Sequence, residues 1–111
     1  MKTLSLSRPL IIMVVGPPGA GKSFFARQFS ETFSVGVAGS DRVRYELFAE
    51  PQFTNDENDI VSRLQDYVAS ELVKSGRSFM VDGGCSTRTA RQKYEMLAKT
   101  NGYGTLVVWV Q

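Results

Sequence analysis

An apolar run that ends at a glycine-rich octet constrains the fold of this chain more than any other feature. Leu10–Val15 is continuous, apolar and rich in β-branched residues, which is the pattern of a strand buried on both faces. The octet Gly16-Pro17-Pro18-Gly19-Ala20-Gly21-Lys22-Ser23 follows directly. Beyond it, Phe25, Phe29 and Phe33 recur at the spacing of an amphipathic helix. We therefore expect a strand, a tight loop and a helix in immediate succession.

The octet matches the pattern G-x-x-x-x-G-K-[ST], whose chemistry is phosphate binding. Glycines let the backbone turn tightly, so that its N–H groups can surround an anion, and the N-terminal dipole of the next helix faces the same point. We expect Lys22 to reach the β- and γ-phosphates and the Ser23 hydroxyl to ligate Mg²⁺. The sequence thus predicts a site for ATP and Mg²⁺ made of Gly16, Pro17, Pro18, Gly19, Ala20, Gly21, Lys22, Ser23 and Phe24.

The rest of the chain alternates apolar runs with amphipathic stretches. Further strands are predicted at residues 35–38, 79–81 and 105–110. Ser40 is expected to cap a short helix. Thr54 stands three residues before Glu57, which is the capping-box spacing, and is expected to open a long helix. The last helix is expected to begin near Thr87. This alternation predicts an α/β domain over residues 1–111, with a parallel sheet and right-handed crossovers.

The long helix has a predicted apolar face, and Gly76 is placed to end it. The residues of this face are Ile60, Val61, Leu64, Val68, Leu72 and Val73. The aromatic residues Phe24, Phe25, Phe29 and Phe33 are interpreted as core rather than as a platform for stacking bases.

Composition excludes several classes of site. The chain has one cysteine, Cys85, and no histidine, so an internal disulfide, a common zinc site and a His-dependent triad are all excluded. The formal net charge of +2 does not by itself indicate nucleic acid. Leu10–Val15 is too short to span a membrane. These features predict a cytoplasmic protein with no membrane partner, in which Cys85 serves packing.

A second constellation, Asp41-Arg42-Val43-Arg44, follows the second predicted strand. Together with the octet it resembles the P-loop kinase group that includes polynucleotide 5′-hydroxyl kinases and zeta-toxin-type kinases. The resemblance implies a three-layer α/β/α core with strand order 2-3-1-4, in which Lys22, Asp41 and Arg44 are catalytic. Asp41 would be the general base and Arg44 a clamp for the acceptor or its phosphate. A carboxylate that orients a hydroxyl and takes its proton suits phosphoryl transfer on chemical grounds as well.

The same resemblance extends to the third strand and the last helix. It implies that Asp82 helps Ser23 to hold Mg²⁺, and that Arg88 and Arg91 are possible acceptor-binding residues. A solvated helix face is an equally good interpretation of these two arginines. The family pattern continues Asp-x-Thr-Asn, whereas this chain departs from it with Asp82-Gly83-Gly84-Cys85.

The leading hypothesis is therefore an ATP-dependent phosphotransferase that acts on a hydroxyl acceptor, which is a small molecule, a nucleotide or a nucleic-acid end. An AAA-type motor is a second hypothesis, but it requires a glutamate after Asp82, where this chain has Gly83. A nucleotide-binding or regulatory module without catalysis is a third. A GTPase is excluded because Asn-Lys-x-Asp is absent.

The last predicted strand, from Thr105 to Val110, is followed by a single residue. Without a covering element, such an apolar edge strand favours association. We expect that a C-terminal lid portion continues the domain, so that these residues are an N-terminal fragment of a larger kinase domain, or that self-association covers the strand edge.

Overall fold

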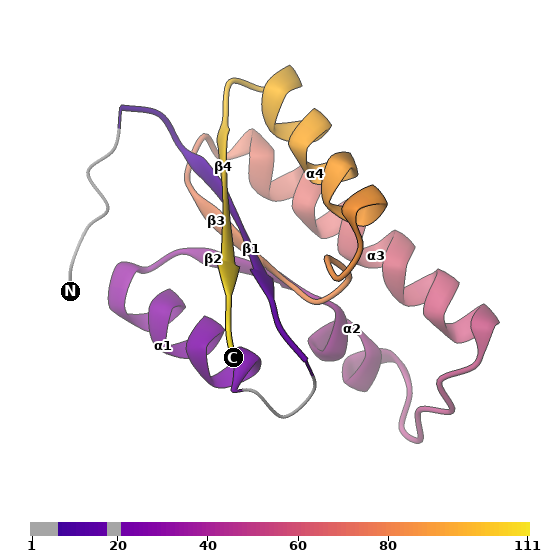
Figure 1. Ribbon diagram of the computed structural model, residues 1–111. Helices are drawn as coiled ribbons and strands as arrows, with labels where there is room; N and C mark the ends of the chain where they lie inside the picture. The colour runs from indigo at the N-terminus through magenta and orange to yellow at the C-terminus, as the bar shows by residue number, and fades with distance from the viewer. Residues whose placement is uncertain (1–6, 18–20) are drawn as a thin grey trace.

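The computed structural model describes residues 7–17 and 21–111, without the side chain of Ser23. Strands and helices alternate along this part of the chain as the sequence predicts, and the short and long helices predicted after the second strand both form (Figure 1). The elements are β1 (Leu10–Val15), α1 (Lys22–Phe33), β2 (Gly36–Gly39), α2 (Ser40–Leu47), α3 (Asn55–Lys74), β3 (Phe79–Asp82), α4 (Arg88–Thr100) and β4 (Gly104–Trp109). All strand pairs are parallel and the sheet order is β2-β3-β1-β4, which confirms the predicted order.

The central strand β1 supplies both halves of the core. Its side chains alternate between the faces of the sheet, as the strand pleat requires. Ile11 and Met13 pack in a cluster with residues of α3 and α4, whereas Ile12 and Val14 pack in another with Ala26 of α1. Figure 1 shows the resulting layers, with α3 and α4 on one face and α1 on the other. The three-layer prediction is confirmed.

The phenylalanine stripe of α1, made of Phe25, Phe29 and Phe33, forms as predicted. Phe25 and Phe29 pack against the core, and ring centroids are 5.9 Å apart for Phe25–Phe29 and 4.7 Å for Phe29–Phe33. The assignment of Phe24 to the core is wrong, because its side chain is 60% exposed. Phe24 lies one position off the i, i+4 stripe and therefore on another side of the helix.

The inward face of α3 differs from the predicted apolar face. Ile60 and Leu64 are exposed, and Val68 and Leu72 are only partly buried. The buried residues instead follow a strict i, i+4 series: Glu57, Val61, Gln65, Ala69 and Val73. Two polar side chains therefore stand on the buried stripe, and a search for apolar residues alone selects a face rotated away from the sheet.

Helix ends follow local chemistry in most places. Thr54 Oγ1 accepts a hydrogen bond from the Glu57 N–H at 3.2 Å and Thr87 Oγ1 accepts one from the Ala90 N–H at 3.1 Å, which confirms both starts. The prediction that Ser40 caps α2 is wrong: Gly39 is the N-cap residue and Ser40 lies in the first turn. Since Gly39 continues β2 in extended conformation, the helix begins immediately at the strand end.

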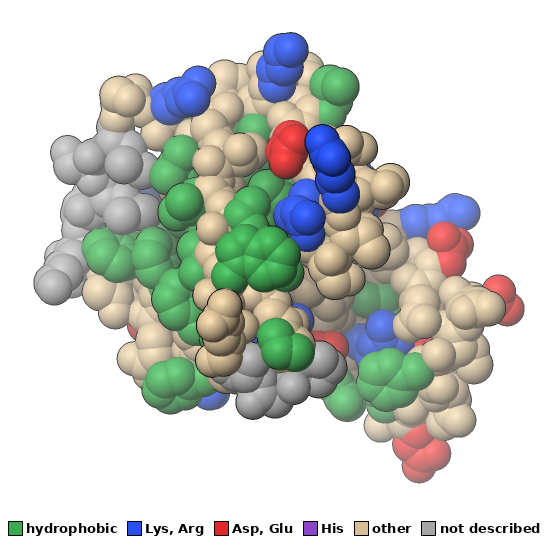
Figure 2. All heavy atoms as spheres, viewed as in Figure 1, with side chains coloured by type: hydrophobic (Ala, Val, Ile, Leu, Met, Phe, Trp, Pro, Cys, Tyr) green, Lys and Arg blue, Asp and Glu red, His purple; other side chains and the backbone are tan. Residues whose placement is uncertain are grey.

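Strand β4 leaves apolar side chains exposed at the edge of the sheet. Leu106 is 45% exposed and Trp109 is 60% exposed. Figure 2 shows hydrophobic side chains gathered on the face where β4 lies in front in Figure 1. Within the described ranges, no helix combines the length and the apolar content that crossing a bilayer requires.

Candidate functional site

Three parallel strands, β1, β2 and β3, have their carboxyl ends on the same side of the sheet, and a residue predicted to serve the site stands at or after the end of each. The register pairs Asp82, the last residue of β3, with Val14 of β1 and with Gly39 of β2. The loop after β1 leads to Lys22, and β2 runs directly into the first turn of α2, which contains Asp41. Ligands of open α/β sheets bind outside the carboxyl ends of strands. The candidate site lies at the carboxyl ends of these strands.

The glycine-rich loop is described at its two ends. A Cβ atom at Gly16 would overlap the Val110 carbonyl oxygen, because the chain after β4 is held close by the Val110 N–H bond to Val15 O at 2.8 Å. Gly21 has φ 86° and caps α1 in a left-handed conformation that favours glycine. Pro18, Gly19 and Ala20, and the side chain of Ser23, lie outside the described residues, so their predicted phosphate and Mg²⁺ contacts stay predictions.

The start of α1 fits an anion. Its first turn contains no acidic residue, and it begins with Lys22. The positive end of the helix dipole is thus uncompensated by side chains, unlike that of α2, where Asp41 stands in the first turn. The donors present here are those that a nucleotide phosphate requires.

Charges of Lys22 and Asp41 both act on Asp82. Burial raises the pKa of Asp82 above its ordinary value, the Lys22 ammonium lowers it, and the Asp41 carboxylate raises it again. The net direction is upward, which means that the ionised carboxylate is held in an unfavourable environment. A carboxylate in such surroundings, beside the predicted phosphate site, has the chemistry of a ligand for a hard cation or its bound water.

The end of β3 is packed tightly against the beginning of α2. Gly83 has φ 99°, and a Cβ atom there would overlap Ser40 Oγ. The positive φ favours glycine at this position. The glutamate that a hydrolytic motor requires after Asp82 is absent, and the backbone conformation here disfavours a residue with a side chain.

Gln65 is a residue of this region that the sequence interpretation missed. Its side chain is buried, and Nε2 donates to Ala38 O at 3.1 Å and to Gly83 O at 2.9 Å, with Asp82 O at 3.5 Å. One amide of α3 thus joins the ends of β2 and β3, from which Asp41 and Asp82 emerge. The signal that could have identified it is a polar residue on an otherwise apolar helix stripe.

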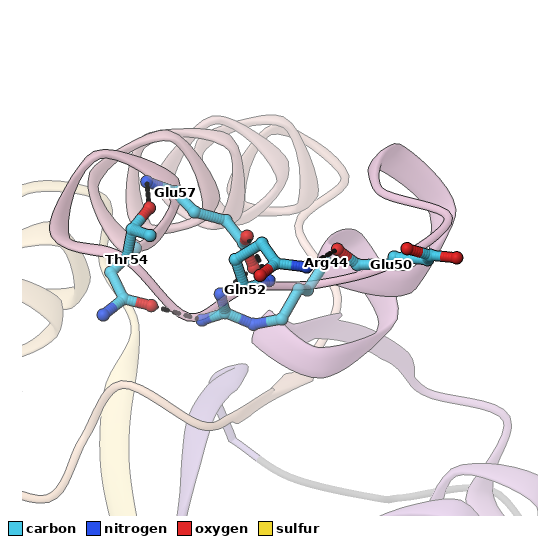
Figure 3. A network of polar contacts seen from close by, with 6 residues as sticks. Arg44, Glu50, Gln52, Thr54 and Glu57 are labelled. Atoms are coloured by element: carbon cyan, nitrogen blue, oxygen red, sulfur yellow. Dashed lines mark hydrogen bonds and ion pairs between the residues drawn. The ribbon is translucent and has the colours of Figure 1, made fainter.

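Arg44 lies one helical turn after Asp41 and is buried rather than open to the site. Its Nη1 contacts Glu57 Oε1 at 2.5 Å, and its Nη2 donates to Asn58 Oδ1 at 2.8 Å. Figure 3 shows the side chain reaching from α2 toward the first turn of α3. The acceptor-clamp role of Arg44 stays a prediction, and the contacts that the structure gives this guanidinium are with protein groups.

The two arginines of α4 differ in their surroundings. Arg88 is exposed in the first turn. Arg91 donates from Nη1 to Cys85 O at 3.0 Å and lies over the Trp109 ring, 5.4 Å from its centroid. Cys85 itself is buried, and burial raises its pKa to about 11 despite nearby cations, so the thiol stays protonated and serves packing as predicted.

Comparisons with known proteins place these observations in a family. A family model described as AAA domain matches residues 11–111. No curated protein matches the sequence. Among solved structures, a presumed kinase from Chloroflexus aurantiacus has a TM-score of 0.79 at 13% identity and covers 96% of this chain. A chain of the Pnkp1/Rnl/Hen1 complex has a TM-score of 0.78 at 21% identity, over 99% of this chain.

A third similar structure is an APS kinase of Mycobacterium tuberculosis in complex with AMPPNP and APS, with a TM-score of 0.64 at 22% identity over 94% of this chain. The present chain covers 61%, 38% and 63% of these three proteins in the same order, and thus less than two thirds of each. At these identities the likeness shows the fold, which is that of P-loop kinases.

Proposed function

Because this chain belongs to the AAA domain family, we propose that it binds ATP–Mg²⁺ in the loop after β1 and passes the γ-phosphate to a hydroxyl acceptor. The observation that carries the proposal is the convergence of Lys22, Asp41 and Asp82 at one edge of a parallel sheet of order β2-β3-β1-β4. A cation, a general base and a metal-side carboxylate are the groups that phosphoryl transfer requires. The solved kinases of the same fold are consistent with this class of reaction.

Each residue has a distinct role in the proposed mechanism. Bound ATP–Mg²⁺ supplies the transferred group and a cation that offsets its charge. Lys22 and the N–H groups at the start of α1 hold the β- and γ-phosphate oxygens. Ser23 and Asp82 hold the cation or its water, and Asp41 orients the acceptor hydroxyl and takes its proton. Arg88, exposed at the start of α4, is available to an anionic acceptor.

Two alternatives are less well supported. A motor that hydrolyses ATP requires a glutamate after Asp82, and this chain has Gly83 there, in a backbone conformation that favours glycine. A module that binds nucleotide without transfer would share Lys22 but has no use for Asp41 beside the phosphate site. We also propose a cytoplasmic location, since ATP is the phosphate donor and the single thiol needs no oxidising compartment.

Lys22→Ala tests the binding half of the proposal. Loss of a charge-assisted contact to phosphate is expected to weaken ATP–Mg²⁺ binding by roughly 10- to 100-fold. Isothermal titration calorimetry of the chain measures this, with Lys74→Ala, which removes an exposed lysine at the end of α3, as the matched control. Equal affinity of the Lys22→Ala and wild-type chains for ATP–Mg²⁺ would contradict the proposal.

Asp41→Asn tests the transfer half. Binding of ATP–Mg²⁺ is expected to stay within about twofold, whereas phosphate transfer falls by roughly 10²–10⁴, the usual contribution of a general base. The measurement is ATP consumption by the full-length protein against a panel of hydroxyl acceptors, with the exposed Asp59→Asn as control. Transfer at the wild-type rate would remove Asp41 from the role of base.

A further inference from the structure

Arg44 is the centre of a polar cluster that joins α2 to the first turn of α3, away from the strand ends. Arg44 is only 8% exposed, although an arginine on an eight-residue surface helix ordinarily points to solvent. Its guanidinium carbon lies 4.4 Å from the centroid of the Phe53 ring, which covers it from the loop between α2 and α3. Such a buried and covered cation requires a reason in the folded structure.

The anion that balances Arg44 is itself fixed from several sides. Glu57 is 6% exposed; one carboxylate oxygen contacts Arg44 and the other accepts the Gln52 N–H at 2.8 Å. Burial acts to raise the pKa of Glu57, but the N–H of Gln52, the Arg44 side chain and the N–H of Phe53 lower it, and the net direction is downward. The carboxylate is thus ionised and held in one orientation (Figure 3).

This arrangement leaves Arg44 with little capacity for a ligand. Nη1 donates one N–H to Glu57 and Nη2 donates one to Asn58, and the burial of the side chain leaves little of the second N–H on either nitrogen open to a ligand. The remaining nitrogen, Nε, is buried and has no hydrogen-bond partner among the described residues. In this arrangement an acceptor phosphate cannot reach it. A clamp for anions needs exposed N–H groups in a fork, and this guanidinium directs them into protein.

Arg44 is nevertheless connected to the proposed chemistry through its own helix. Asp41 and Arg44 are three residues apart on α2 and so lie on neighbouring positions of one helical surface. The hydrogen bonds of Arg44 to the first turn of α3 restrain rotation of this short helix about its axis. They therefore act on the direction in which Asp41 projects from the same helix.

We propose that Arg44 is a positioning residue for Asp41 and not an acceptor clamp, and that Glu57 is its partner in this role. The inference rests on the proposed function, in which Asp41 is the base. It deepens that function in one respect: recognition of any acceptor phosphate falls to other groups, such as Arg88, and the Arg44–Glu57 pair fixes the distance between the two carboxylates of the site.

A first experiment follows the carboxyl ¹³C signal of Asp82 as a function of pH. Lys22 and Asp41 are the charges that act on this titration, in opposite directions, so with Lys22 left in place the midpoint responds to the position of Asp41. The double variant Arg44→Gln/Glu57→Gln keeps the net charge. In it, the pH midpoint of the Asp82 titration is expected to fall toward the midpoint measured in the Asp41→Asn variant. The matched control Arg42→Gln/Glu46→Gln removes an exposed pair from the same helix and should leave the midpoint unchanged.

An unchanged Asp82 midpoint in the buried-pair variant, or an equal fall in the control, would overturn the proposal. If the double variant fails to fold, Asn58→Ala removes one hydrogen bond to Arg44 and is read in the same way, with a smaller fall expected.

A second experiment needs no variant and tests the clamp directly. Inorganic phosphate is titrated into the wild-type chain while the Arg44 Nε–H signal and the Gly21 and Lys22 amide signals are followed by ¹⁵N NMR. The Arg44 signal is expected to stay in place, since its Nε is buried and its terminal nitrogens donate to Glu57 and Asn58. A saturable shift of that signal would restore the clamp and refute the positioning role. Static Gly21 and Lys22 amides would instead count against the proposed phosphate cradle, so the two failures are distinguishable.

Discussion

At the scale of single residues, the site contains a carboxylate whose ionised form is energetically unfavourable in its surroundings. Asp82 is partly buried; burial raises its pKa most, while the charge of Lys22 lowers it and that of Asp41 raises it. A folded-state pKa above the unfolded value means that stability is fully present below the unfolded pKa and is lost as pH rises through the folded one. Functional carboxylates commonly have this property.

Asp82→Asn is therefore expected to stabilise the chain at pH 7 by a few degrees in Tm, because the unfavourable charge is removed while the shape is kept. The gain should disappear below about pH 3.8, the ordinary pKa of the side chain, where wild-type Asp82 is protonated in both states. Thermal unfolding followed by circular dichroism at several pH values measures both. Asp59→Asn, on the exposed face of α3, should change Tm little; a lower Tm for Asp82→Asn at pH 7 would contradict the interpretation.

At the scale of elements, α3 does more than cover the sheet. Its buried stripe carries two polar side chains with different partners: Glu57 binds α2 through Arg44, and Gln65 binds the ends of β2 and β3. Tyr103, which precedes β4, adds a contact at the other end of the helix, where its hydroxyl donates to Val73 O at 3.0 Å. The helix thus links the elements that carry Asp41 and Asp82.

Gln65→Leu keeps the size of the side chain and removes the donor shared by three carbonyls. We expect a loss of roughly 1–3 kcal/mol in the free energy of unfolding, the usual cost of leaving buried polar groups without a partner. Denaturant titration measures it, and Gln92→Leu on the exposed side of α4 is the matched control. A Gln65→Leu variant as stable as the wild type would show that water or other donors replace the amide.

At the scale of the whole molecule, the sheet has one edge whose surface favours association. The residues of β4 include neither lysine nor proline, the usual protections of an edge strand. Leu106 and Trp109 are exposed beside this edge. Self-association through the strand from Thr105 to Val110 stays a prediction, and the exposed backbone and side chains supply its physical reason.

Leu106→Lys is expected to weaken such association by roughly tenfold or more in Kd, because a charge would have to be buried at the new contact. Sedimentation velocity over a range of concentrations measures the distribution of masses. Leu47→Lys places the same charge at a 50% exposed position on α2 and should leave the distribution unchanged. A wild-type chain that stays monomeric at all concentrations would exclude the edge as a contact between copies.

The sequence by itself determined the parallel α/β architecture and the elements that carry Lys22, Asp41 and Asp82, because these depend on short-range information: hydrophobic period, glycine positions and residues at strand ends. It did not determine that Arg44 is buried against Glu57, that Gln65 joins two strands, or that Ile60 and Leu64 face outward. Those outcomes join residues 13 to 27 positions apart or depend on how a helix is rotated against the sheet. Only packing of the complete chain fixes such relations, since a local pattern carries no information about which distant group will satisfy a buried charge or amide.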